Sequence, residues 1–211
     1  TLSLANRLTG SSPVEGEPLK FLGIRYSQYM RVYGDLRFYV ELPGNNKLVN
    51  RWFAGLGYAY GNSDVLPYQK QFYSGGTGSL RGFRYRSIGP GTFRHTDADR
   101  TFFDQTGDIK LESNLEYRFR ITQLFRGAFF LDAGNIWLME TNPEKPGGRF
   151  KWNDFLSELA VNAGLGLRLD ASFVVLRLDL GIPFRKPYMA ECQRWVIDEF
   201  DISDTEWRRN N

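Results

Sequence analysis

The chain has 211 residues, with 27 basic and 24 acidic side chains and a net charge of +3. This near balance argues against a dedicated nucleic-acid surface, which would be strongly and locally basic. The single cysteine and single histidine exclude an internal disulfide framework, a cysteine metal cluster and a multi-histidine zinc site. No apolar run reaches the roughly 18 residues of a transmembrane helix, whereas a transmembrane strand needs only about 9–11. The first residues include neither an initiator methionine nor a signal peptide, so we expect a piece of a longer protein.

Alternation of apolar and polar side chains predicts long antiparallel strands along most of the chain. In each strand one face is apolar, while the other carries full charges or glycines. Six strands are expected, at 24–42, 51–61, 108–121, 125–137, 156–170 and 173–184. The glycine-lined face around Gly55 and Gly57 indicates that another backbone packs closely against it.

The connections between these strands alternate in length. Short ones are expected near 43–47, 121–124 and 170–172, and long ones at 10–23, 62–106, 138–155 and 185–211. Tight turns at one end and long loops at the other are typical of outer-membrane barrels. The strands are also longer than the roughly 5–6 residues usual in globular sheets. We therefore favour an all-β, antiparallel transmembrane β-barrel over a soluble β-sandwich adhesin. The apolar positions expected to face lipid include Leu111, Leu115, Phe119, Leu165, Leu167, Leu176 and Leu178.

The long loop at 62–106 contains a glycine-rich, cationic stretch at 72–91. Six glycines and a proline prevent this stretch from forming a regular helix or a central strand. It is not a P-loop, because Gly78 is followed by Ser-Leu-Arg and no lysine is nearby. A dinucleotide fingerprint would require glycine where Arg81 stands. The stretch is therefore a ligand loop or an internal plug.

The same stretch carries a family resemblance. Gly-Gly-Thr-Gly-Ser-Leu-Arg-Gly-Phe at 75–83 and Ile-Gly-Pro-Gly at 88–91 resemble the loop motif of the BamA/TamA-type outer-membrane assembly superfamily. The family order continues downstream, with Leu-Glu-Tyr at 115–117, Phe-Phe-Leu-Asp-Ala-Gly-Asn at 129–135, Gly-Leu-Gly-Leu-Arg at 164–168 and Gly-Ile-Pro-Phe at 181–184. The resemblance covers 24–184, and its tyrosine-rich, loop-rich style is most similar to the Bacteroidetes branch.

The resemblance implies a barrel of sixteen strands, preceded by periplasmic POTRA domains and opened at a lateral gate between its first and last strands. Residues 1–211 would then be a partial C-terminal barrel domain of six consecutive strands, without the gate. The implied function is assembly, insertion or translocation of outer-membrane proteins, with no cofactor and no enzymatic step. The implied partners are outer-membrane lipid, client β-barrel proteins and periplasmic or lipoprotein accessory subunits, and no nucleic acid. The alternative within the family is a secretion pore or a barrel that anchors a passenger domain.

The resemblance also implies a site. Arg81, Gly82 and Phe83 match the loop motif, in which the arginine reaches acidic residues on the inner wall of the barrel. The matching wall positions are Glu116 and Asp132, both on predicted polar faces. The alternative is that all three charged groups are solvated.

Neither catalytic residues nor a metal site are expected in this chain. His95 and Cys192 fall in separate loops, and the acidic residues are spread along strand faces.

Overall fold

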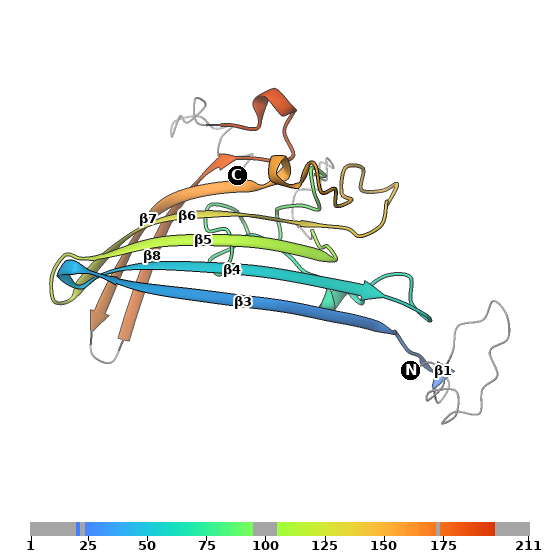
Figure 1. The fold of residues 1–211 in the computed structure, drawn as a ribbon, viewed down its shortest axis with the longest axis horizontal. Helices are drawn as coiled ribbons and strands as arrows, with labels where there is room; N and C mark the ends of the chain where they lie inside the picture. Colours follow the sequence, from blue (N-terminus) through green and yellow to red (C-terminus); the bar gives the residue numbers. More distant parts are fainter. Residues whose placement is uncertain (1–19, 22–23, 95–104, 172–173, 197–211) are drawn as a thin grey trace.

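The computed structural model describes residues 20–21, 24–94, 105–171 and 174–196. Most of these residues form one antiparallel six-stranded sheet in the order β3-β4-β5-β6-β7-β8 (Figure 1), beside a two-stranded β1-β2 ribbon. The sheet strands are β3 (Tyr29–Leu42), β4 (Asn46–Ala59), β5 (Ile109–Arg120), β6 (Phe125–Trp137), β7 (Ala160–Ala171) and β8 (Val174–Arg185). The predicted all-β, antiparallel architecture is confirmed, and β3 and β8 are the two open edges of the sheet.

Three strand starts differ from the predicted ones by four or five residues. The strand expected from residue 24 is interrupted, because Ile24–Arg25 (β2) pairs with Lys20–Phe21 (β1) and β3 starts only at Tyr29. β4 starts at Asn46 rather than residue 51, since the turn after β3 is a single 3-10 turn at Pro43–Asn45 (η1).

The third difference lies before β7. The segment Phe155–Glu158 (η3) is a short 3-10 helix, so β7 begins at Ala160 rather than at residue 156. Two further 3-10 turns lie at Tyr68–Lys70 (η2) and Glu191–Gln193 (η4). Among the described residues there is no helix long and apolar enough to cross a membrane.

The two faces of the sheet differ in chemistry, as the alternation predicts. Leucines of the apolar face are exposed, with Leu165 at 54% and Leu178 at 71% of their full accessible surface. The opposite face carries Glu112, Glu116 and Asp132, which are all buried. Within the described part of the chain no second large sheet covers the apolar face, as the core of a soluble sandwich would require. An exposed apolar face opposite a buried charged face is the pattern of a membrane barrel wall.

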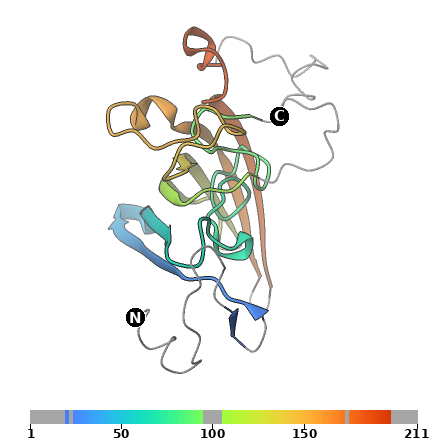
Figure 2. The ribbon, with the colours of Figure 1, turned by 90° about the vertical axis from the view of Figure 1, so that its right-hand side faces the viewer.

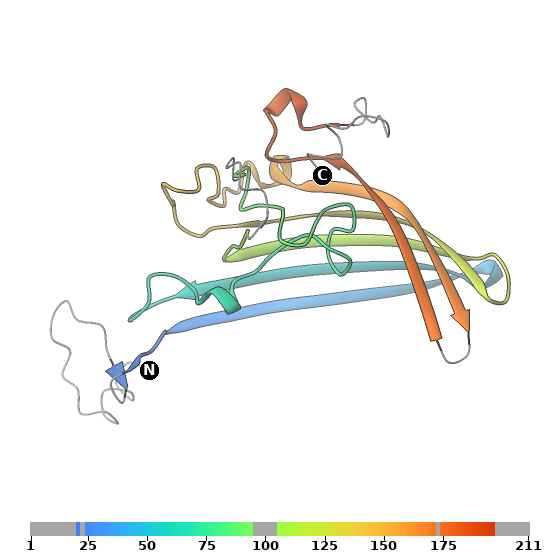
Figure 3. The same ribbon diagram turned by 180° about the vertical axis from the view of Figure 1, so that it is seen from behind.

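The described part of the loop between β4 and β5, residues 60–94 and 105–108, packs against the charged face. Figures 2 and 3 show this loop in green and teal, lying in the hollow of the curved sheet. At Gly55, an added Cβ would lie 2.6 Å from the ring of Phe72, and at Gly57 it would lie 2.6 Å from the side chain of Leu66. The glycine-lined face of β4 therefore does accommodate a close neighbour, which reaches it with loop side chains rather than with backbone.

Candidate functional site

The loop presents Arg81 from a compact series of turns. The backbone N–H of Ser79 donates to the carbonyl of Gly76 at 3.0 Å, and that of Phe83 donates to Leu80 at 3.1 Å. The N–H of Gly76 in turn donates to the carbonyl of Phe83 at 2.9 Å, which closes the segment on itself. These local bonds give the arginine a fixed starting point although it belongs to a loop.

The guanidinium of Arg81 binds Asp132 of β6 bidentately, through two parallel hydrogen bonds. Its Nε donates to Oδ2 at 2.9 Å and its Nη2 donates to Oδ1 at 2.7 Å, while the backbone N–H of Arg81 also donates to Oδ2 at 3.1 Å. Asn114 and Asn162 each donate a further hydrogen bond to this carboxylate at 3.0 Å. Asp132 is fully buried, so its charge is compensated by this ring of donors.

Glu116 of β5 accepts a hydrogen bond from the third guanidinium nitrogen of Arg81. Nη1 of Arg81 donates to its Oε2 at 2.5 Å. Arg118 donates to the other oxygen at 2.6 Å, and Arg177 of β8 donates to Oε2 at 3.3 Å. The guanidinium also lies over the ring of Phe130, 3.6 Å from the ring centroid. The side chain of Arg81 thus bonds carboxylates on two strands, β5 and β6, and Arg177 links β8 to the same Glu116. Glu116, unlike Asp132, has other cations beside it.

Gly82 and Phe83 complete the motif. A Cβ at Gly82 would lie 2.6 Å from Cβ of Asn162, and one at Gly181 of β8 would lie 2.7 Å from the backbone nitrogen of Gly82. Only glycine allows the loop and the wall to approach this closely. Phe83 is 8% exposed and packs in a cluster with Leu80, Ile88 and Ala160 that Tyr188 covers.

A second cluster of contacts was not among the residues expected from the sequence. Ser79 Oγ donates to Glu112 Oε2 at 2.5 Å, and the same carboxylate pairs with Lys110 at 2.8 Å and with Arg51 at 3.1 Å. Arg51 and Lys110 also donate to loop carbonyls, those of Gly78 and Tyr73. The loop is therefore held at two places on the same strand, β5.

The long-loop end of the sheet holds one further buried carboxylate, Glu158 of η3. Its Oε2 accepts a hydrogen bond from Trp137 Nε1 at 2.6 Å. Burial raises the pKa of Glu158 above its ordinary value, and the indole hydrogen bond opposes this rise only in part. Glu158 therefore favours its protonated form more in the folded chain than in the unfolded chain.

The other side chains considered from the sequence add nothing to this site. His95 lies outside the described residues. Cys192 is an exposed, free thiol. Among the residues that the structure describes, no group of histidine, cysteine, aspartate and glutamate has the grouping of a metal site. The arrangement of Arg81 and its partners is suited to holding a loop in place.

Comparison with known proteins places this arrangement in a family. The chain is 24% identical over 169 residues to the outer membrane protein assembly factor BamA of Neisseria meningitidis serogroup B, which covers 72% of this chain and 20% of that protein. Its fold is similar to the crystal structure of BamA from Haemophilus ducreyi lacking POTRA domains 1–3, with a TM-score of 0.58 and 21% identity. That alignment covers 78% of this chain and 33% of the other, so the chain spans about a third of the solved relative. The sequence model of the Omp85 superfamily domain matches residues 17–199, and the chain therefore belongs to the Omp85 superfamily.

Proposed function

We propose that this chain is part of the barrel of an outer-membrane protein assembly or insertion factor, and that the Arg81 contacts hold its long loop against the inner wall. Membership of the Omp85 superfamily supports the outer-membrane location and the general role in assembly. The observation that carries the finer proposal is the bidentate bond between Arg81 and the buried Asp132. The sixteen-stranded closed barrel and the preceding POTRA domains remain predictions.

The proposed role of the loop is mechanical. The wall strands β5, β6 and β8 all contact Arg81 or its carboxylate partners, so the loop cross-links the wall from inside. A barrel that opens a strand seam to admit a client needs the rest of its wall to keep its shape, and a cross-linked wall meets that need. The proposed partners are client β-barrel proteins, surrounding lipid and accessory lipoproteins. Assembly of a client strand by strand at an open seam requires neither a cofactor nor an enzymatic step.

The test is client assembly by the full-length protein reconstituted in liposomes. Arg81→Ala should slow the folding of a β-barrel client several-fold, and Arg81→Lys should restore it only in part, because lysine cannot bond a carboxylate bidentately. Arg149→Ala is the matched control, since this exposed arginine lies on a separate loop and should leave the rate unchanged. A folded Arg81→Ala protein that assembles clients at the normal rate would contradict the proposal.

The second candidate function is a secretion pore, which the family resemblance also allows. The same liposomes distinguish the two when a soluble, unfolded polypeptide is offered in place of a barrel client. Release of that polypeptide across the bilayer without client insertion would favour the pore.

A further inference from the structure

Four arginines stand directly opposite one another across neighbouring strands at the short-turn end of the sheet. The strand register pairs Arg120 of β5 with Arg126 of β6, Arg126 with Arg168 of β7, and Arg168 with Arg177 of β8. We call these four residues the arginine row. Like charges directly opposite each other on one face of a sheet destabilise it. A row of this kind therefore needs compensating anions.

The carboxylates near the row are largely committed already. Both oxygens of Glu116 accept hydrogen bonds from arginines, including Arg177, and Arg177 also bonds Asp179. Among the described residues, the ion-pair partner of Arg126 is Asp170, at a long distance of 3.4 Å, and both side chains are partly exposed. Arg168 makes no hydrogen bond or ion pair with any residue that the structure describes, although it is half-buried. The row thus has unused donors at its centre.

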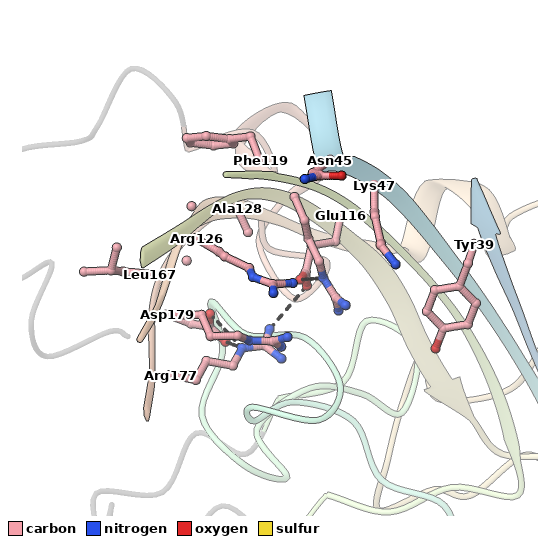
Figure 4. Close-up of a pocket in the computed structure, with 14 residues that line it drawn as sticks. Tyr39, Asn45, Lys47, Glu116, Phe119, Arg126, Ala128, Leu167, Arg177 and Asp179 are labelled. Atoms are coloured by element: carbon pink, nitrogen blue, oxygen red, sulfur yellow. Dashed lines mark hydrogen bonds and ion pairs between the residues drawn. The ribbon is translucent and has the colours of Figure 1, made fainter. Parts of the chain in front are cut away.

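A pocket of about 180 Å³ opens over this part of the row. Its cationic lining residues are Lys47, Arg118, Arg126, Arg168 and Arg177, against the two carboxylates of Glu116 and Asp179. Figure 4 shows Arg126 and Arg177 reaching toward the pocket from β6 and β8. The cationic groups of the pocket come from the charged face, and Phe119 and Leu167 of the apolar face also line it.

We propose that the arginine row binds an acidic polypeptide segment that enters the barrel from its short-turn end. In outer-membrane barrels this end faces the periplasm. Adjacent strands are about 4.8 Å apart, so the row extends over about 14 Å. Same-face side chains of an extended peptide recur about every 6.7 Å, so three alternating carboxylates cover nearly the same length. Arginine suits this ligand because its planar fork bonds carboxylates bidentately. The inference does not depend on the assembly function.

The experiment uses the full-length protein in lipid nanodiscs and a fluorescent peptide with glutamate at alternate positions. Binding is measured by fluorescence anisotropy, with a glutamine-for-glutamate peptide and inorganic phosphate as separate arms. The glutamate peptide should bind at least tenfold more tightly than the glutamine peptide. Arg168→Gln should weaken binding of the glutamate peptide about tenfold, as expected for one lost charge-assisted contact. The affinity of Arg168→Lys for the glutamate peptide should lie between those of Arg168→Gln and the parent protein. Arg149→Gln, at the other end of the sheet, should leave this affinity unchanged.

A purely structural role for Arg168 gives a different result. If the arginine served the fold alone, Arg168→Gln would lower the unfolding temperature of the peptide-free protein, whereas relief of like-charge repulsion should leave it equal or higher. Arg126→Gln provides a second variant should the first fail to fold. Equal binding by Arg168→Gln and the parent protein would overturn the proposal, as would equal binding of the two peptides. Phosphate that binds in an Arg168-dependent way while the glutamate peptide does not would identify a phosphate site instead.

Discussion

The contact between Arg81 and Asp132 allows a quantitative prediction through a double-mutant cycle. Arg81→Ala removes both guanidinium donors and leaves the fully buried Asp132 with the backbone N–H of residue 81 and the side-chain amides of Asn114 and Asn162. Breaking a buried ion pair by removing one partner costs about 3–5 kcal/mol. The side chain of Arg81 is only 5% exposed, so we expect the destabilisation to lie in this range rather than near the 0–1 kcal/mol of an exposed pair.

The coupling energy distinguishes the two carboxylate partners of Arg81. Combining Arg81→Ala with Asp132→Asn should give a coupling of about 1.5–3 kcal/mol, because two charge-assisted hydrogen bonds are lost together. Combining it with Glu116→Gln should give less than about 1 kcal/mol, since Arg118 and Arg177 still compensate this carboxylate. The assay is urea unfolding of the intact, lipid-reconstituted barrel, followed by the shift of its folded band on unheated gels.

Equal coupling energies in the two cycles would mean that Asp132 is not the principal partner of Arg81. Strict additivity between Arg81 and Asp132 would mean that the bidentate bond contributes nothing to stability. A stronger coupling to Glu116 than to Asp132 would mean that the shared carboxylate, and not the buried one, fixes the loop.

Three further predictions follow from single positions. Gly82→Ala should cost about 1–3 kcal/mol through overpacking against β7, whereas Gly78→Ala, with nothing within 4 Å of the added carbon, should have little effect on the same urea midpoint. Leu165→Arg on the apolar face should cost about 2–4 kcal/mol in the folded barrel, and Tyr33→Arg on the charged face should cost far less; equal costs would mean that the faces are misassigned. Because the pKa of Glu158 is raised in the folded chain, its contribution to stability should decline as pH rises from its ordinary value of 4.5 through the raised value. Glu158→Gln should flatten that part of the stability–pH curve, and an unchanged slope would refute the assignment.

The strands and their faces could be predicted from the sequence because alternation is a local signal. For β5 and for β6, each predicted strand end lies within one residue of the observed one. The start of β4 was missed because Lys47 and Asn50 do not continue the apolar alternation, and a neighbouring strand rather than their own chemistry holds them in the sheet. Residues 156–158 were misassigned because a short 3-10 helix and a strand end look alike over so few positions.

The site residues also fall into a part that could be predicted from the sequence and a part that could not. Arg81, Glu116 and Asp132 could be named in advance because a family motif and strand parity both indicated them, and the structure brings the three together. The contact between Ser79 and Glu112 could not, because it depends on how the loop lies along β5, and the two residues are 33 positions apart. The arginine row could not be predicted either, since it exists only once the register of four strands is known.

The most direct test of the central claim is hydrogen exchange of the loop amides in the intact barrel. The N–H groups of Gly76, Ser79 and Phe83 are hydrogen-bonded within the loop, which Arg81 holds against the wall. In the parent protein these amides should exchange slowly, and in Arg81→Ala they should exchange at least tenfold faster, while β5 and β6 remain protected. Unchanged slow exchange in Arg81→Ala would contradict the account, because the loop would then be held without its arginine.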